Sequence, residues 1–223
     1  AADVIRGRRS AVAFDGRTPF PRDRFFSVLD ASRPRPGVPP LDVVPWPPLL
    51  HLLILAHRVE GIPQGIYLLP RSRRGASLLR AEIGHGWLWE DVPSCPGHLP
   101  LACLAREETG TLARVLSCHQ DIAADSAFSL GMLAEFEDTV GRGAWWYRRL
   151  FWEAGALGQL LYLEAEAAGF RGTGIGCFFD DEVHRLLGLS GRRFQSLYHF
   201  TVGKGVEDAR LSTLPPYAHL AGR

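Results

Sequence analysis

The longest regular pattern of apolar residues in the chain runs from about Ala144 to Ala168. Apolar side chains recur there at steps of three and four residues, which is the spacing of one helix face. The recurring positions are Trp146, Leu150, Ala154, Leu157, Leu161, Ala165 and Ala168. Phe151, Leu160 and Leu163 widen this stripe until little polar surface is left, so we expect a helix buried against more than one neighbour, in the core or at a subunit interface.

The segment after this helix changes its period. Gly169 is expected to end the helix, because glycine adopts positive φ without a steric penalty. Gly172 to Phe179 then reads as a short strand whose glycines let another group come close to the main chain. Asp180 and Asp181 supply an N-cap and a first-turn acid for a helix over 182–187, which a glycine ends.

Four further apolar segments predict strands. Leu49–Val59 and Gly65–Leu69, joined by a short turn, form the clearest hairpin candidate. Ala127–Phe136 has the composition of a strand buried on both faces, and Leu197–Val202 alternates enough to be a strand.

The remaining segments are less regular. The sequence predicts a short helix near residues 3–8, a strand over 10–14 and a helix over 21–29. Residues 32–48 hold seven prolines, which predicts an extended loop. Residues 75–108 show no clear period and are a candidate lid or insertion, and 203–223 read as an extended tail. We expect residues 1–223 to form one domain.

Composition and charge narrow the function classes. A chain of 223 residues with 46% apolar residues can bury one sizeable core. The net charge is +1 and the two signs are interspersed, so the charge pattern favours neither nucleic acid nor an anionic membrane as a partner. No run approaches the roughly 18 apolar residues of a membrane span, and no signal-peptide pattern opens the chain. We therefore expect a soluble, cytoplasmic protein.

The cysteines are interpreted as reduced and mostly buried thiols. Cys95, Cys103, Cys118 and Cys177 lack the spacing of a zinc site, so no metal is expected. A cytosolic chain of this size does not need disulfides. The chain begins at Ala1 and has a single internal methionine, Met132. We expect it to be one domain of a longer tandem polypeptide.

Short motifs occur in a definite order along the chain. They are Arg8-Arg9-Ser10 with Ala13-Phe14-Asp15, His57 to Gly61 with Gly65-Ile66-Tyr67, Tyr147-Arg148, Glu153 to Gln159, Gly176-Cys177-Phe178 and Tyr198 to Gly203. In this order the motifs resemble the FMN-dependent nitroreductase-like family, and in particular its SagB-type (azoline) dehydrogenase branch. The resemblance implies an α+β fold with a central, mainly antiparallel sheet flanked by helices, and a long buried central helix.

The resemblance also assigns the cofactor. Paired guanidinium groups bind phosphate with parallel hydrogen bonds, so Arg8, Arg9 and Ser10 are expected to hold the phosphate of FMN. Lys204 and Arg210 are the matching candidates from the other end of the chain. The resemblance places Gln159 against the flavin. It places Gly176 and Cys177 at the flavin edge, as the catalytic positions, where a backbone N–H faces N5.

The implied activity is hydride transfer through FMN, with NAD(P)H or a peptide as possible substrates. The implied partner is a second copy in a homodimer, or a sister domain in a pseudo-dimer. One position departs from the family pattern, because Leu160 replaces an asparagine that follows the glutamine. The Lys–Tyr pair of azoline-oxidising members is also not evident, so azole synthesis is not the first hypothesis. A flavin-free dimer partner or binding module is the main alternative.

Three other interpretations carry less weight. Cys118 and His119 with Asp121 suggest a thiol hydrolase, but consecutive residues point to different faces. Cys177 is an alternative candidate for a redox-active thiol near the flavin. The glycines of 172–176 resemble part of a dinucleotide fingerprint, but that motif follows a strand and opens a helix, whereas this segment follows a helix.

Overall fold

The computed structural model describes residues 1–220 and is built around a seven-stranded sheet with the order β3-β4-β2-β1-β5-β7-β6. The strands are β1 (Leu50–Ala56), β2 (Gly65–Leu69), β3 (Glu90–Asp91), β4 (Ala102–Ala105), β5 (Phe128–Glu135), β6 (Arg171–Ile175) and β7 (Phe194–Gly203). Every neighbouring pair of these strands is antiparallel. The predicted hairpin is confirmed as β1 and β2, and β6 is an edge strand.

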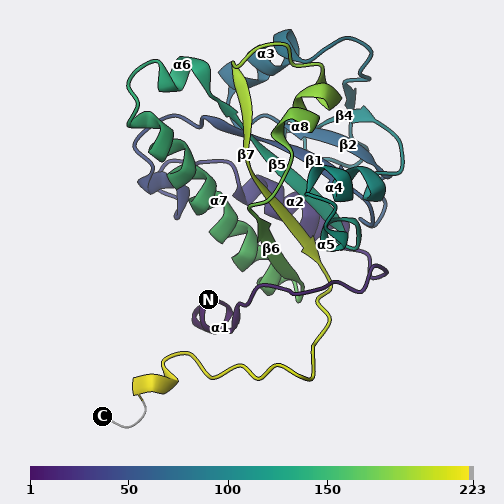
Figure 1. Cartoon of the computed structure of the whole chain (residues 1–223), viewed down its shortest axis with the longest axis vertical. Helices are drawn as coiled ribbons and strands as arrows, with labels where there is room; N and C mark the ends of the chain where they lie inside the picture. The colour runs from purple at the N-terminus through teal and green to yellow at the C-terminus, as the bar shows by residue number, and fades with distance from the viewer. Residues whose placement is uncertain (221–223) are drawn as a thin grey trace.

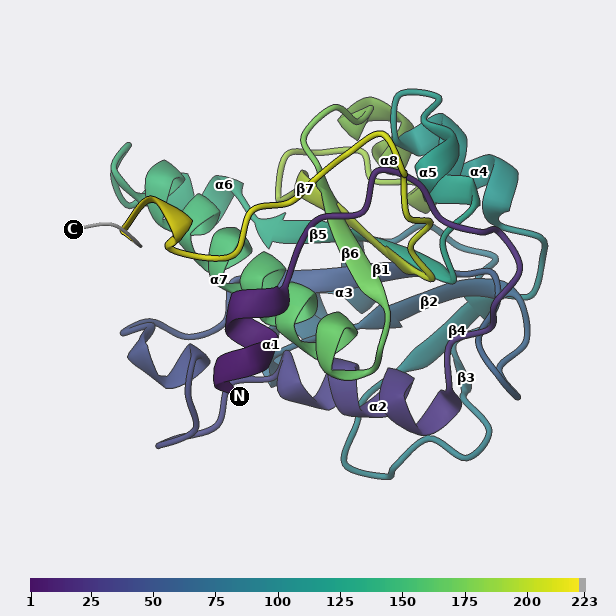
Figure 2. The ribbon, with the colours of Figure 1, turned by 90° about the horizontal axis from the view of Figure 1, so that it is seen from below.

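Helices cover both faces of the sheet. They are α1 (Ala2–Gly7), α2 (Arg22–Ala31), α3 (Arg73–Glu82), α4 (Gly110–Leu116), α5 (Asp121–Ala124), α6 (Glu137–Val140), α7 (Trp146–Ala167) and α8 (Asp180–Leu187), with 3-10 turns at Leu41–Val43 and Ala218–Leu220. Side chains of α2 and α7 pack on one face, and those of α3, α4 and α8 pack on the other (Figures 1 and 2). The predicted fold class is confirmed: the chain is α+β, with an antiparallel sheet flanked by helices and one long helix.

The core is divided by the sheet because strand side chains alternate between faces. In β1, Leu52 and Ile54 join the cluster under α2 and α7, whereas Leu53 and Leu55 join the cluster under α3, α4 and α8. Both sets are buried, which explains why β1 reads as a continuous apolar run. The same holds for β5, which lies in the centre of the sheet and is buried along its whole length.

The long helix α7 is anchored to the sheet by a buried ion pair. Glu153 on α7 bonds the guanidinium of Arg71 at 2.5 Å, and both side chains are almost fully buried. The Glu153 carboxylate also accepts hydrogen bonds from the backbone N–H groups of Leu49 and Leu50, where β1 begins. Removing one partner of such a pair leaves an uncompensated buried charge, so the pair fixes α7 against the start of β1.

The opposite side of α7 is open within one chain. Gly169 ends the helix with φ +75°, as predicted. Large apolar side chains nevertheless remain exposed at the beginning of the helix, namely Trp145, Tyr147, Phe151 and Trp152. The sequence predicts burial against more than one neighbour, and within this chain α7 is buried on one side only.

One prediction for the irregular segments was wrong. Residues 10–14 do not form a continuous strand; only Ser10 and Phe14 make isolated bridges, to Gly172 and Gly205, because the segment passes from one partner, β6, to another, the start of the tail. The region 75–108, in which the sequence shows no clear period, supplies most of α3 and the strands β3 and β4 at one edge of the sheet. Its role as a lid stays a prediction.

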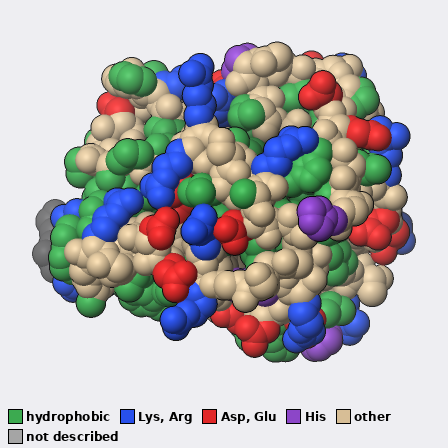
Figure 3. Space-filling model, turned by 90° about the horizontal axis from the view of Figure 1, so that it is seen from above, with side chains coloured by type: hydrophobic (Ala, Val, Ile, Leu, Met, Phe, Trp, Pro, Cys, Tyr) green, Lys and Arg blue, Asp and Glu red, His purple; other side chains and the backbone are tan. Residues whose placement is uncertain are grey.

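The tail after β7 runs away from the sheet (Figure 1). The last three residues of the predicted tail, 221–223, lie outside the described residues. Within residues 1–220, no helix combines the length and the apolar character that crossing a bilayer requires. Basic and acidic side chains are interspersed over the face shown in Figure 3. Among the ion pairs, Arg74–Asp138 and Arg193–Glu82 join different elements of the chain.

Candidate functional site

The N-terminal segment lies along the free edge of β6. The backbone N–H of Ala11 donates to the carbonyl of Gly172 at 3.1 Å, and Thr173 Oγ1 donates to the carbonyl of Ala11 at 2.7 Å. Ser10 forms a parallel bridge with Gly172. The topology thus brings the predicted phosphate-binding motif beside the glycine-rich segment, although more than 150 residues separate the two along the chain.

Tyr162 on α7 joins these two segments. Its hydroxyl lies 2.9 Å from Ser10 Oγ and accepts a hydrogen bond from the backbone N–H of Gly174, also at 2.9 Å. The guanidinium of Arg8 lies over the Tyr162 ring, 4.6 Å from its centroid. In the structure Arg8 therefore makes a cation–π contact with Tyr162. Tyr162 was not among the sequence candidates; its signal is a polar tip three residues after Gln159, on the same side of the helix.

The glycines of β6 serve different purposes. A Cβ on Gly172 would meet the ring of Phe200 from β7, and a Cβ on Gly174 would meet the hydroxyl of Tyr198. Both glycines are thus required by aromatic side chains of the neighbouring strand. A Cβ on Gly176 would have no heavy atom within 4 Å, and its φ is not positive. Packing within the described chain therefore does not account for the glycine at position 176.

The backbone at residues 176–177 presents free donors. Gly172 and Gly174 direct backbone groups away from β7, and β6 ends at Ile175, one residue before Gly176. Neither the N–H of Gly176 nor that of Cys177 has an acceptor among residues 1–220. Both residues are exposed. These N–H groups are therefore available to a ligand.

A cavity of about 290 Å³ opens at the other end of β6, between the N-terminal segment and the start of the tail. Arg9, Ser10 and Arg171 line it together with the carboxylates of Glu207 and Asp208. Arg9 donates to the carbonyl oxygens of Arg6 and Arg8 at 3.0 and 2.8 Å, which holds its guanidinium at this position. Two guanidinium groups and a hydroxyl are thus brought together.

The other predicted cofactor ligands lie elsewhere. Lys204 donates to the carbonyl of Gly169 at 2.9 Å and lies near the Phe170 ring, at the end of β6 away from Gly176. Arg210 is exposed and forms an ion pair with Asp208 at 2.7 Å. Gln159 is exposed on α7, and its side-chain amide makes no hydrogen bond to any residue in 1–220. The structure brings none of these three side chains to the backbone of Gly176.

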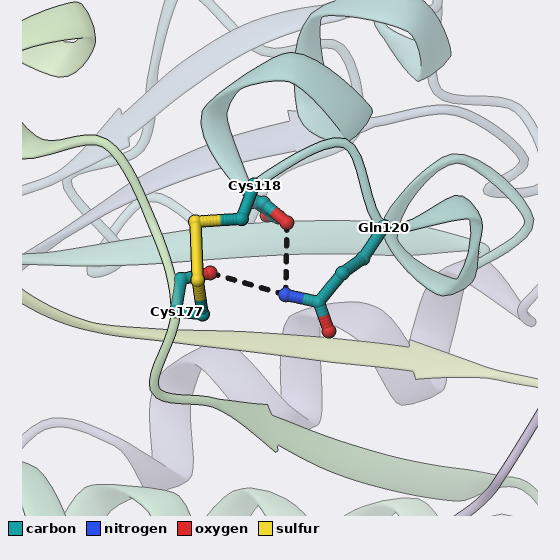
Figure 4. Close-up of a disulfide and its surroundings, with 4 residues drawn as sticks. Cys118, Gln120 and Cys177 are labelled. Carbon is teal, nitrogen blue, oxygen red and sulfur yellow. Dashed lines mark hydrogen bonds between the residues drawn. A yellow bond between two sulfur atoms is a disulfide. The ribbon is translucent and has the colours of Figure 1, made fainter.

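Cys177 is joined to Cys118 by a disulfide (Figure 4). The prediction of reduced thiols is wrong for these two residues and holds for Cys95 and Cys103, which are unpaired. The two Cα atoms lie 5.8 Å apart, within the normal range for a disulfide. Sequence reasoning missed the pair because 59 positions separate the cysteines, and only the packing of α4 beside the segment after β6 brings them together.

The arrangement at Cys118 also removes the thiol-hydrolase interpretation. The Cys118 sulfur is bonded and is not free as a nucleophile. The ring of His119 packs edge-on against Phe179, with centroids 5.7 Å apart. Asp121 forms an ion pair with Arg114 at 2.7 Å and does not orient an imidazole. No nucleophile–base–acid arrangement exists at these positions.

An aromatic stack fixes the segment that follows Cys177. The ring of Phe178 lies 4.4 Å from that of His199 with an interplanar angle of 11°. His199 Nε2 lies 3.1 Å from Ser196 Oγ, and burial lowers the pKa of His199 to about 4. The imidazole is therefore neutral near pH 7 and acts as a flat packing surface. The motion of Cys177 is thus limited by its own disulfide and by the stacked ring of the next residue, Phe178.

Comparisons with known proteins define the fold. The model of the Nitroreductase family matches residues 106–204. A candidate nitroreductase from Anabaena variabilis superposes with a TM-score of 0.66 at 22% identity, covering 91% of this chain and 37% of its own. A chain of the E. coli microcin synthetase McbBCD complex gives 0.62 at 19% identity, covering 90% of this chain and 69% of that one. The chain has the nitroreductase-like fold.

A third neighbour is the NADPH:FMN oxidoreductase from Vibrio harveyi, with a TM-score of 0.56 at 13% identity, covering 100% of this chain and 75% of that one. This chain spans little more than a third of the length of the Anabaena protein. No curated protein sequence matches the chain.

The groups at the edge of β6 fit a flavin mononucleotide. The guanidinium groups of Arg9 and Arg171 line the cavity and suit a phosphate, although each also has partners within the chain: Arg9 donates to two carbonyls, and Arg171 forms an ion pair with Glu166 at 3.3 Å. The free N–H groups at residues 176–177 suit an acceptor atom of the ring. Glu207 and Asp208 oppose an anion in the same cavity, and Asp208 is already paired with Arg210 at 2.7 Å.

Proposed function

We propose that this chain is a unit of an FMN-dependent oxidoreductase that transfers hydride between FMN and a second substrate. One observation carries the proposal: the N–H groups of Gly176 and Cys177, which have no acceptor among residues 1–220, directly follow β6, and the segment of Arg9 and Ser10 lies along the edge of the same strand. Gly172 and Gly176 are four residue steps apart, about 13 Å along an extended strand. The proposed phosphate site thus lies near Gly172, and the proposed site for the flavin ring lies near Gly176.

The residues of the chain have distinct roles in this proposal. When bound, FMN supplies the atom that accepts and donates hydride. Arg9, Ser10 and Arg171 bind the phosphate and fix its position. The N–H groups of Gly176 and Cys177 donate to the ring edge and stabilise the charge that develops there, without any acidic side chain.

The other predicted ligands have lesser roles. Gln159 lies one turn before Tyr162 on α7, where its amide reaches the flavin only if the ring lies across the helix. Arg8, Lys204 and Arg210 remain candidates for the phosphate, each after release from its present partner. They rank below Arg9 because they do not line the cavity.

The flavin-free alternative is not favoured by the position of Leu160. Two features suggest that alternative: Leu160 replaces an asparagine of the family pattern, and the basic residues of the tail, Lys204 and Arg210, are uncertain phosphate ligands. Leu160 is only 5% exposed and packs in the core under α2 and α7, whereas Gln159 beside it is exposed. Leu160 therefore stands at a core position, and its replacement of asparagine does not remove a polar side chain from the exposed side of α7.

A companion unit completes the site in this proposal. The exposed aromatic side chains at the start of α7 form an apolar patch, and Gly155 beside them has no heavy atom within 4 Å of an added Cβ. An exposed glycine within a helix costs about 1 kcal/mol relative to alanine, and it allows a second backbone to come close. A second copy of the chain or a sister domain of a longer polypeptide fits this face.

The substrate belongs to one of two classes. The Vibrio harveyi neighbour was solved with NAD⁺, and the E. coli synthetase complex with truncated pro-MccB17. NAD(P)H or a peptide are accordingly the candidates for this chain, and a SagB-type role stays a prediction. So does a cytoplasmic location.

Reconstitution tests the proposal. Purified protein is incubated with FMN, separated from free ligand and scanned for absorbance, and the released cofactor is identified by mass spectrometry. Flavin absorbance that stays with the protein supports the proposed oxidoreductase. Protein that remains colourless at saturating FMN contradicts it and supports the flavin-free module.

A further inference from the structure

We propose that the Cys118–Cys177 disulfide is a redox-active site whose reducing substrate is a dithiol. This inference does not depend on the flavin, because it concerns a sulfur–sulfur bond held by the chain alone. The bond joins the loop after α4 to the segment after β6 (Figure 4). Cys177 is exposed and Cys118 is half-buried, so an incoming thiolate has access to the bond from the side of Cys177.

The two segments are held together without the disulfide. Gln120 Nε2 donates to the carbonyl of Ser117 at 2.9 Å and to the carbonyl of Cys177 at 3.1 Å, so that one amide group bridges both sides of the bond (Figure 4). The backbone N–H of Phe179 donates to the carbonyl of Leu116 at 2.9 Å. These contacts hold both sulfurs close after reduction, which favours rapid reclosure.

The backbone at Cys118 has the geometry of a functional loop. Cys118 and His119 are consecutive non-glycine residues in the left-handed region, with φ of +53° and +59°. Such residues cost free energy and persist where the surrounding structure holds them; they cluster at functional sites. Here the Gln120 amide and the His119–Phe179 contact hold the loop.

The remaining thiols do not compete for this chemistry. Burial raises the pKa of the Cys95 and Cys103 thiols, which disfavours the thiolate forms that attack disulfides. Both are unpaired. They serve as internal controls in every experiment on the disulfide.

The proposed reaction is a balanced exchange. A thiolate of the external dithiol attacks Cys177 Sγ, the bond to Cys118 Sγ breaks, and Cys118 leaves as a thiolate that takes up a proton. The second thiolate of the dithiol attacks the mixed disulfide and releases Cys177, which is protonated in turn. The dithiol is oxidised to a disulfide and the protein cystine is reduced to two thiols, with two electrons and two protons transferred.

The first test equilibrates flavin-free native protein with reduced and oxidised dithiothreitol at a series of ratios. Alkylation and peptide mass spectrometry then read each cysteine separately. The expected result is that Cys118 and Cys177 become alkylated together, are protected again on reoxidation, and that circular dichroism shows the fold retained. A bond that resists the dithiol until the protein unfolds contradicts the proposal, as does alkylation of both cysteines without reductant.

The second test compares reagent access to the two sulfur positions, on which the assignment of Cys177 as the attacked sulfur rests. In Cys118→Ser the remaining Cys177 thiol is expected to react with 5,5′-dithiobis(2-nitrobenzoate) at least about tenfold faster than Cys118 does in Cys177→Ser, because only Cys177 is exposed. Equal or reversed rates contradict the assignment. Both rates are read on flavin-free protein, so a failure to bind FMN leaves this result intact.

The third test measures the positioning role of Gln120. Gln120→Ala removes the bridging amide and is expected to slow reoxidation of the reduced protein about fivefold, the effect of losing roughly one hydrogen bond. Gln64→Ala is the matched control, because Gln64 is exposed and makes no side-chain hydrogen bond within residues 1–220. Equal reoxidation rates for the two variants contradict the role.

Discussion

The phenol oxygen of Tyr162 accepts a hydrogen bond from the backbone N–H of Gly174 at 2.9 Å, and through it helix α7 is joined to the edge strand β6. The same oxygen lies 2.9 Å from Ser10 Oγ, so three distant segments meet at one hydroxyl. The position of the N-terminal motif relative to the 176–177 backbone depends on this junction. The junction can be removed by deleting one atom.

Tyr162→Phe is expected to lower the free energy of unfolding by about 1 kcal/mol, because the N–H of Gly174 loses its acceptor. FMN affinity is expected to fall as well, because Ser10 Oγ loses its hydrogen-bond partner and its orientation is no longer fixed. Urea denaturation and fluorescence titration with FMN measure the two effects. Tyr147→Phe is the control, because Tyr147 is exposed and its hydroxyl has no partner within residues 1–220. Unchanged FMN affinity in Tyr162→Phe contradicts the role given to the junction.

Alanine at the glycines of β6 separates packing from ligand access. Gly176→Ala is expected to fold normally and to weaken FMN binding at least about tenfold, because the methyl group enters only the space that the ligand needs. Gly174→Ala is expected to destabilise the fold, because its Cβ meets Tyr198. Gly191→Ala, which meets no atom within 4 Å, controls for the substitution itself. The proposal is wrong if Gly176→Ala binds FMN as the unmodified chain does.

Stability is expected to fall with acidification because of His199. Burial lowers its pKa to about 4, whereas the unfolded chain keeps a value near 6.5. Between these two pH values the unfolded state binds one more proton than the folded state. The contribution of the neutral His199 to the free energy of unfolding is therefore fully present above pH 6.5. It is lost as the pH falls toward 4, by about 3 kcal/mol.

The measurement compares the pH dependence of urea denaturation in His199→Gln and in the unmodified chain. His57 has a pKa lowered to about 4 by the same cause, burial, so the variant retains part of the slope. A shallower slope between pH 6.5 and 4 is expected for His199→Gln. His85→Gln, at an exposed position, is expected to keep the full slope. Identical slopes in all three proteins contradict the assignment.

The exposed aromatic patch on α7 predicts association. Trp152 is 60% exposed, and its truncation to alanine is expected to weaken self-association at least about tenfold in sedimentation experiments, because aromatic side chains carry much of the binding energy at interfaces. Val43→Ala is the control, since Val43 is 75% exposed but lies outside α7. If the unmodified chain sediments as a monomer, the remaining candidate partner is a sister domain of a longer polypeptide. Association is then measured by sedimentation of a mixture of this chain with that domain.

The sequence predicted the regular elements well where the apolar period was long. The predicted helix over 144–168 is observed at Trp146–Ala167, and the strands β1, β2 and β5 lie within their predicted ranges. These elements bury apolar side chains at the periods on which the prediction rests. The strand predicted over residues 10–14 was wrong because that segment divides its backbone contacts between β6 and residues 205–206, a division that no side-chain pattern reveals.

The site was predicted in part. The order of the sequence motifs selected Arg9, Ser10, Gly176 and Cys177 as candidates. In the structure the segment of Arg9 and Ser10 lies along β6, and Gly176 and Cys177 directly follow that strand. The disulfide could not be found, because choosing a partner for Cys177 requires the topology. Lys204 and Arg210 illustrate the same limit: their charges suit phosphate, but a carbonyl and a carboxylate within the chain already occupy them.

The central claim is that FMN lies along the edge of β6, between the N-terminal motif and residues 176–177. The most direct test is to follow backbone amide resonances of ¹⁵N-labelled protein while FMN is added. The account predicts that amides of residues 9–12 and 174–178 shift together and saturate at one concentration. Shifts confined to the cavity lined by residues 84–88 and 185–188, or no shifts at saturating FMN, would contradict it.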